Sequence, residues 1–155
     1  MSFRITGLDP SPFRHLYGLT DDALAAHGVR RVVADARPGF PDRIDVRDAE
    51  PGESLLLLNY MHQPADTPYR ASHAIFVREG AEQAYSEVGA VPEALRARAI
   101  SLRAFSEAGE MIDADLVDGR DLEPSIARLL ARPDVAYLHA HFARLGCYAA
   151  RIDRA

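Results

Sequence analysis

Hydrophobic and polar residues alternate along many short segments of the chain, and this alternation predicts β-strands. Residues 54–62 differ, because their four consecutive leucines indicate burial on both faces and a central place in a sheet. Thr20 followed by two aspartates is a typical helix start, with a hydroxyl cap and negative charge in the first turn. The expected strands are residues 3–7, 31–36, 43–47, 54–62, 74–78, 99–105, 110–117, 135–143 and 147–153, and the expected helices are residues 12–17, 20–28 and 122–131.

These elements predict an α+β fold. About eight strands and about three helices, joined mostly by short turns, favour a largely antiparallel sheet with helices beside it. The chain has 155 residues and shows no internal repeat or long polar linker. We therefore expect a single globular domain spanning residues 1–155, which is large enough to bury a core without disulfides or metals.

The hairpin expected at residues 99–117 has aspartates at alternate positions. Matching the apolar residues across a loop at residues 107–109 pairs Arg103 with Asp113 and gives Gly109 the left-handed backbone that such loops require. Asp113 and Asp115 resemble a metal-ligand pair, but the arginine opposite favours an exposed face with salt bridges.

The C-terminal hairpin concentrates reactive side chains. Matching its apolar residues across a loop at residues 144–146 pairs His139 with Arg151, His141 with Ala149, and Ala143 with Cys147. On this register the two histidines, the cysteine and Arg151 project from one face. Neighbouring positions on such a face lie about 5 Å apart, which is close enough to share a ligand.

Six segments along the chain carry a family resemblance: residues 48–53 (DAEPGE), 55–60 (LLLLNY), 68–72 (PYRAS), 75–78 (IFVR), 146–148 (GCY) and 151–154 (RIDR). Through them the chain resembles an uncharacterised bacterial family, the domain-of-unknown-function family twelve-oh-three. The resemblance covers most of the chain and implies no activity. The chain departs from the family pattern near Asp42, His73 and Phe142, where the family has cysteine, glycine and asparagine.

Composition excludes several classes of function. The net charge of −5 argues against a nucleic-acid binder, and no apolar run is long enough to cross a membrane. All 18 basic residues are arginine, so neither a Schiff-base lysine nor a phosphate loop of the Gly-Lys-Ser/Thr kind is available. The single cysteine allows no internal disulfide. With no evident signal peptide, we expect a cytoplasmic protein.

Two enzyme chemistries fit the C-terminal hairpin. His139 and His141 alternate on a strand and can present two imidazoles to a transition metal, with Cys147, His62 or Asp153 as the third ligand. Alternatively, Cys147 beside His141 can form a reactive thiolate. A lone cysteine is more often a small buried apolar residue, and two histidines are a weak signal for a metal.

A third chemistry combines this hairpin with the loop at residues 63–72. Arginine with neighbouring hydroxyls suits a carboxylate or phosphate, although the same side chains can instead brace a long loop. We expect a small anionic ligand in a crevice between the hairpin and this loop, and no cofactor. The alternatives are the metal- or thiol-dependent enzyme and a structural protein that forms a homodimer. The residues expected to bind the anion are Tyr69, Arg70, Ser72 and Arg151.

Overall fold

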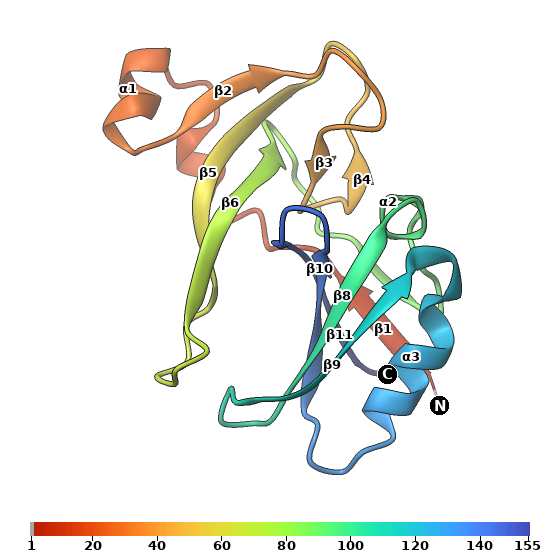
Figure 1. The fold of residues 1–155 in the computed structure, drawn as a ribbon. Coiled ribbons are helices and arrows are strands. Elements are labelled where there is room, and N and C mark those ends of the chain that lie inside the picture. The colour runs from red at the N-terminus through yellow and green to blue at the C-terminus, as the bar shows by residue number, and fades with distance from the viewer. Residues whose placement is uncertain (1) are drawn as a thin grey trace.

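The computed structural model describes residues 2–155, which form two packed β-sheets with short helices at their margins (Figure 1). One sheet has six strands in the order β7-β1-β11-β10-β8-β9, and the other has five in the order β2-β5-β6-β3-β4. Within this part of the chain only the short β3–β6 pairing is parallel. The predicted α+β class is confirmed. The strands lie in two largely antiparallel sheets rather than one, and β3, β4 and β7 are too short for an alternating pattern to reveal.

The six-stranded sheet packs one face against the C-terminal helix. Helix α3 (Leu122–Leu130) buries Leu122, Ile126, Leu129 and Leu130, whose spacing puts them on one side of a helix. Helix α2 (Glu93–Arg96), which the sequence pattern does not reveal, and the 3₁₀ turn η2 (Gly119–Asp121) lie at the same face. The strands are β1 (Phe3–Thr6), β7 (Ser86–Val88), β8 (Ala99–Phe105), β9 (Met111–Asp118), β10 (Tyr137–Phe142) and β11 (Cys147–Arg154).

The five-stranded sheet carries the N-terminal helices. The Thr20 hydroxyl accepts a hydrogen bond from the Ala23 amide, so the predicted cap of α1 (Asp21–Ala26) is confirmed. The helix expected at residues 12–17 is only the 3₁₀ turn η1 (Arg14–Leu16). As the leucine run predicts, β5 lies inside the sheet, between β2 and β6. The strands are β2 (Arg30–Val33), β3 (Pro41–Asp42), β4 (Arg47–Asp48), β5 (Ser54–Gln63) and β6 (Ala71–Arg78).

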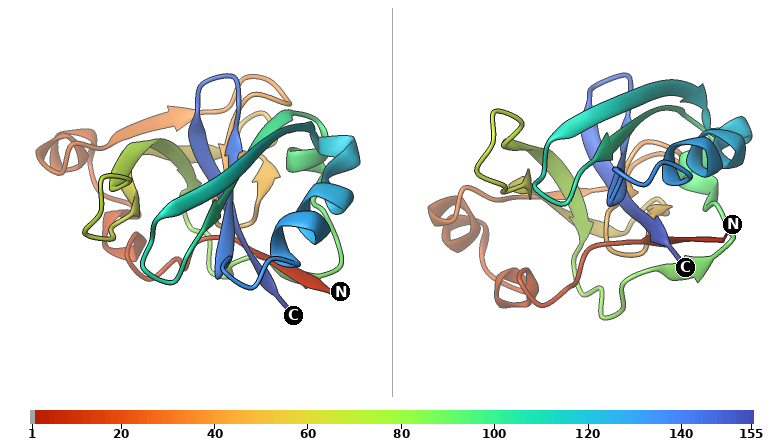
Figure 2. Two further views of the ribbon diagram at one scale, coloured as in Figure 1. Left: turned by 60° about the horizontal axis from the view of Figure 1, so that its bottom comes forward. Right: turned by 90° about the horizontal axis from the view of Figure 1, so that it is seen from below.

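The two sheets meet where the C-terminal hairpin faces β5 and β6. Leu56, Leu58, Ile75 and Val77 from the five-stranded sheet share one buried cluster with Tyr148 from β11. Figure 2 shows α1 and α3 at opposite ends of the molecule, so neither helix covers this junction. The chain ends lie together, since the Ser2 hydroxyl donates to the Ala155 carbonyl over 2.7 Å.

The β8–β9 hairpin differs from its predicted register by one residue. Gly109 has the expected positive φ of 81°, but an irregularity between Ala104 and Phe105 pairs Arg103 with Ala114 and Ala104 with Asp113. Asp113 and Asp115 therefore turn toward α3, where Arg132 and Arg128 form ion pairs with them. The expected pairing of Arg103 with Asp113 is wrong, because the β-bulge moves the two aspartates to the α3 face, whereas Arg103 stays on the opposite face.

A second bulge alters the C-terminal hairpin. His139 pairs with Arg151 as predicted, but the register then shifts, so that His141 pairs with Tyr148 and Phe142 with Cys147. The expected pairings of His141 with Ala149 and of Ala143 with Cys147 are wrong. Ala149 is the extra residue of the bulge, so Cys147 and Tyr148 project from the faces opposite to those that regular alternation predicts. Tyr148, rather than Cys147, lies beside the histidines.

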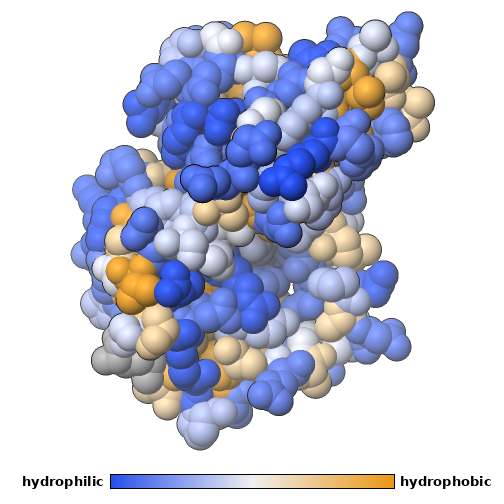
Figure 3. Space-filling view, turned by 180° about the vertical axis from the view of Figure 1, so that it is seen from behind, coloured by the Kyte–Doolittle hydropathy of each residue, from blue (hydrophilic) through white to orange (hydrophobic). Residues whose placement is uncertain are grey.

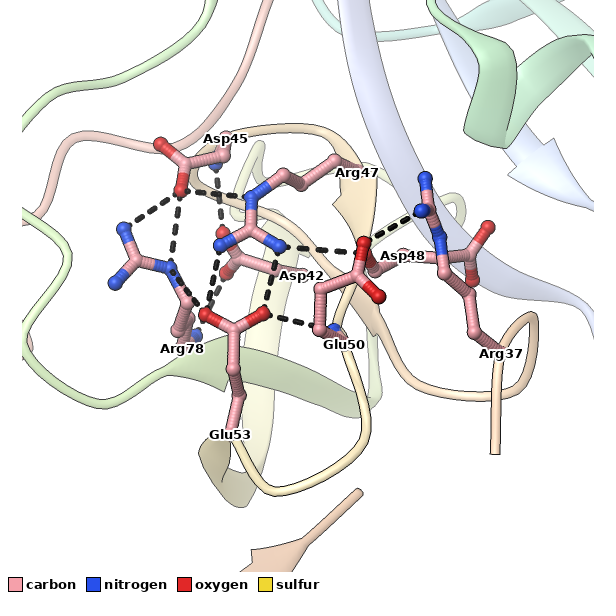
Figure 4. A network of polar contacts seen from close by, with 8 residues as sticks. All are labelled: Arg37, Asp42, Asp45, Arg47, Asp48, Glu50, Glu53 and Arg78. Atoms are coloured by element: carbon pink, nitrogen blue, oxygen red, sulfur yellow. Dashed lines mark hydrogen bonds and ion pairs between the residues drawn. The ribbon is translucent and has the colours of Figure 1, made fainter. Parts of the chain in front are cut away.

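A polar network fixes the turn between β3 and β4 against β6 (Figure 4). The buried Asp42 carboxylate accepts hydrogen bonds from the backbone amides of Ile44, Asp45 and Arg78. Around it, Arg78 pairs with Asp45, and Arg47 pairs with Glu53. Burial raises the pKa of Asp42, whereas the Arg47 hydrogen bonds lower the pKa of Glu53 to about 2. This network holds a turn that the sequence pattern predicts as a strand at residues 43–47.

Candidate functional site

Three histidines and a tyrosine gather between the two sheets. We call His62, His139, His141 and Tyr148 the histidine cluster. The His62 ring centroid lies 4.8 Å from that of His141 and 6.2 Å from that of His139. The His62 ring also stacks on Tyr148, with centroids 5.6 Å apart and planes 13° from parallel. His139, His141 and Tyr148 are at most 4% exposed, and His62 is half-buried.

Backbone irregularities bring these side chains together. His62 is the unpaired residue of a register shift between Met61 and Gln63 in β5, and Tyr148 directly precedes the extra residue Ala149 in β11. Bulges of this kind redirect side chains and are enriched beside functional sites. His139 and His141 share a face without a bulge, because alternate residues of a regular strand such as β10 project from the same side.

Three nitrogen atoms of the cluster are buried without a hydrogen-bond partner among residues 2–155. They are Nδ1 of His62, Nδ1 of His139 and Nε2 of His141. By contrast, Nδ1 of His141 lies 2.9 Å from the Gly146 carbonyl oxygen. A carbonyl only accepts, so this nitrogen carries the proton and Nε2 of uncharged His141 is a bare acceptor. Such unsatisfied atoms are rare in folded proteins, and three in one place require an explanation.

The cluster histidines are uncharged at neutral pH. Burial is the largest cause, and it lowers the pKa of His139 and His141 to about 3 and that of His62 to about 4. The neighbouring cations Arg103 and Arg151 lower the pKa of His139 further. Uncharged imidazoles offer both a donor and an acceptor, as metal ligands and proton-transfer groups do.

Two arginines flank His139 across the sheet. Arg103 on β8 and Arg151 on β11 are its direct cross-strand partners, so the three side chains form one row. Arg151 stacks over the Tyr137 ring at 4.1 Å and forms a two-pronged ion pair with Asp153. Arg103 has no carboxylate partner in the described part of the chain, and its Nε donates only to the Ser101 hydroxyl at 3.2 Å. Burial lowers the pKa of Arg103, which nevertheless stays a cation at neutral pH.

The loop at residues 63–72 contacts this region through Gln63 and Thr67. The Gln63 amide donates to the Tyr137 hydroxyl over 2.9 Å, and the Thr67 hydroxyl donates to the Gly109 carbonyl. The loop thus joins the start of β10 and the tip of the β8–β9 hairpin. Arg70 donates to the Pro64 carbonyl over 2.6 Å, a bracing contact within the loop itself. Tyr69 and Ser72 are exposed.

Cys147 lies on the other face of the hairpin from the histidines. It is 8% exposed and belongs to the core cluster beneath α3. Its neighbour is Arg43, a buried arginine whose Nε donates to the Tyr148 carbonyl and whose pKa is lowered mainly by burial. The thiol–imidazole pair that the predicted register places on one face therefore has its two members on opposite faces.

The surface is hollowed near its centre, between the two sheets, and hydrophilic residues predominate around the hollow (Figure 3). Two surface pockets lie elsewhere, one beside α2 and η2 and the other along residues 83–87.

Comparison with known protein families shows which family the chain belongs to. A family model described as a protein of unknown function, DUF1203, matches residues 39–154. The chain belongs to the DUF1203 family. No curated protein and no solved structure matches the chain. The predicted resemblance is thus confirmed, and every residue of the histidine cluster lies within the matched DUF1203 region.

The geometry of this DUF1203 chain bears on the metal hypothesis. Among residues 2–155, no three or more His, Cys, Asp or Glu side chains are arranged to hold a metal ion. His139 and His141 share a face as predicted, but Cys147 does not join them.

The described helices include none that is long and apolar enough to cross a membrane.

Sequence reasoning missed Arg103 and Tyr148 as members of the site. Tyr148 lies next to a bulge, so a strict alternation of faces assigns it to the wrong side. Alternation gives Arg103 its correct side, but it does not show that β8 pairs with β10 or that Asp113 pairs elsewhere. One signal was present: on the predicted register Asp115 had no cation opposite, whereas α3 offers Arg128 one helical turn before Arg132. If the aspartates had been paired with these arginines, Arg103 would have been recognised as an arginine without a carboxylate partner.

Proposed function

We propose that this domain binds a small anionic ligand between its two sheets, in front of the histidine cluster. Arg103 and Arg151 would supply the positive charge, from adjacent strands. The loop at residues 63–72 would form the opposite wall, with Tyr69, Arg70 and Ser72 at its exposed end. This proposal keeps the ligand class expected from the sequence and adds Arg103 as its principal contact.

The unpaired guanidinium of Arg103 carries the proposal. Most buried or half-buried charges in proteins have a partner, because removing a charge from water is unfavourable. Here the neighbouring titratable groups are histidines and Arg151, and the nearby carboxylate of Asp153 is already held by Arg151. A partly buried cation with free N–H groups on a narrow face is suited to a carboxylate or phosphate oxygen.

The residues around Arg103 also favour the binding of an anion at its guanidinium. The Arg103 backbone lies in the middle of the regular β8–β10 pair, and its Nε is held by the Ser101 hydroxyl at 3.2 Å, which leaves the other guanidinium N–H groups for a ligand. The aromatic rings of Phe105, Tyr137 and Tyr148 border the same face and limit the access of water. A charge-assisted hydrogen bond in such a place contributes about 1.5–3 kcal/mol.

The test is a titration of the wild-type protein and of Arg103→Gln with succinate and with inorganic phosphate, followed by NMR. We expect saturable binding of at least one anion, weakened by about tenfold or more in the variant, as the energy of one such bond implies. Arg144→Gln is the matched control, because Arg144 is an exposed arginine in the β10–β11 loop. Its affinity should equal that of the wild type. Absent saturation, or equal affinities in wild type and Arg103→Gln, would overturn the proposal.

A further inference from the structure

The unsatisfied nitrogens of the histidine cluster restrict the chemistry of the ligand. Nε2 of His141 is the clearest case, because the Gly146 carbonyl fixes the proton on Nδ1. An acceptor buried without a donor is unfavourable, and no donor among residues 2–155 reaches this atom. A bound molecule with an O–H or N–H group would satisfy it.

Charge decides which kind of donor fits. An ammonium group would enter a region where Arg103 and Arg151 are the nearest charged side chains, and Asp153 is already paired with Arg151. Two cations at close range disfavour a third. A hydroxyl donates a hydrogen bond without adding charge, so it suits this position better.

The spacing of the two contacts sets the size of the ligand. Arg103 pairs with His139, and His141 is two residues farther along β10, so Arg103 and His141 are diagonal neighbours. The backbone positions of such neighbours lie about 7–8 Å apart, and both side chains project from the same face of the sheet. One small molecule can therefore contact both side chains.

We infer that the ligand is a small hydroxycarboxylate, whose carboxylate is bound by Arg103 and whose hydroxyl donates to Nε2 of His141. This inference rests on the proposed function and adds the ligand class. Nε2 of His141 is buried, and the half-buried His62 ring stands edge-on to His141 with an interplanar angle of 76°. The inferred ligand would therefore displace the His62 ring on binding.

Matched pairs of acids test the inference. The wild-type protein is titrated with lactate and propionate, and with malate and succinate, each pair differing only in a hydroxyl. We expect the hydroxy acid of each pair to bind about five- to tenfold more tightly, as one buried hydrogen bond implies. In Arg103→Gln both members should weaken together, and the preference for the hydroxy acid should remain.

His141→Phe examines the acceptor itself. The preference should disappear in this variant, while the affinity for propionate and succinate stays the same. Because His141 is fully buried, a second measurement avoids dependence on the variant: the ¹⁵N resonance of His141 Nε2 in the wild type should shift with lactate and not with propionate.

The outcomes separate the two proposals. If neither acid of either pair binds and phosphate does not bind, the proposed function fails. If acids bind without a preference for the hydroxyl, or if only phosphate binds, the inference is overturned and the anion site stands. A preference that persists in a folded His141→Phe, or an unshifted Nε2 resonance, would also overturn it.

Discussion

The stability of this fold should fall steeply between pH 7 and pH 5, because its interior contains histidines that resist protonation. Burial lowers the pKa of His139 and His141 to about 3, whereas unfolded histidine titrates near 6.5. Below pH 6.5 the unfolded chain therefore binds protons that the folded chain does not. The stabilisation is complete above pH 6.5 and is lost progressively as the pH falls toward 3.

The magnitude follows from these values. Each fully buried histidine loses about 2 kcal/mol of stability between pH 7 and pH 5, or about 4 kcal/mol for the two together. His62, which is half-buried, adds less because solvent screens it. Small domains have a free energy of unfolding of about 5–15 kcal/mol, so this loss is a large part of the total.

The assay is urea unfolding at half-unit intervals between pH 7 and pH 5. The slope should correspond to an uptake of about two protons on unfolding in the lower half of the range. Burial raises the pKa of Asp42, which acts in the opposite direction, so variants are compared with the wild type rather than absolute slopes. In His139→Phe the uptake should fall by about one proton. The exposed His27→Gln is the control and should leave it unchanged. Equal slopes in wild type and His139→Phe would refute the reasoning.

Two further predictions concern groups outside the histidine cluster. Asp42→Asn should lower the free energy of unfolding by about 1–3 kcal/mol in urea titrations. The Asp42 carboxylate accepts hydrogen bonds from three backbone N–H groups, and an amide NH₂ would place a donor against one of them. The control Asp66→Asn, in an exposed loop, should leave the free energy of unfolding unchanged. Cys147 should react with a thiol reagent only slowly in the native protein and at once in denaturant, since it lies in the core cluster, and fast native labelling would contradict its assignment to that face.

Much of the fold could be predicted from the sequence because its signals are local. The alternating strands, the Thr20 cap and the glycine turns each depend on a few neighbouring residues, and the structure has them where the pattern indicates. The short strands β3, β4 and β7 give no pattern, since two or three residues cannot show a period. Their pairing depends on contacts distant in sequence, such as Asp42 with β6.

The candidate site was less predictable, because bulges determine which residues share a face. A single extra residue at Ala149 replaces Cys147 with Tyr148 beside the histidines, and an irregularity between Ala104 and Phe105 moves Asp113 away from Arg103. Alternation assumes regular pairing, so it fails at such places. His139 opposite Arg151 lies before the bulge, and this predicted pair is confirmed.

The distribution of charge also favours an anion over a metal ion at the histidine cluster. For two charges about 7 Å apart at an effective dielectric constant of about 20, Coulomb's law gives a repulsion of about 5 kcal/mol between a guanidinium and a divalent cation, and an attraction of about 2 kcal/mol between a guanidinium and a monoanion. Only Asp153 offsets this repulsion, and it is paired with Arg151. Arg103→Gln should therefore change two affinities in opposite directions, weakening carboxylate binding and strengthening any binding of zinc to the three histidines. If both affinities fall together, Arg103 supports the structure of the site rather than its charge.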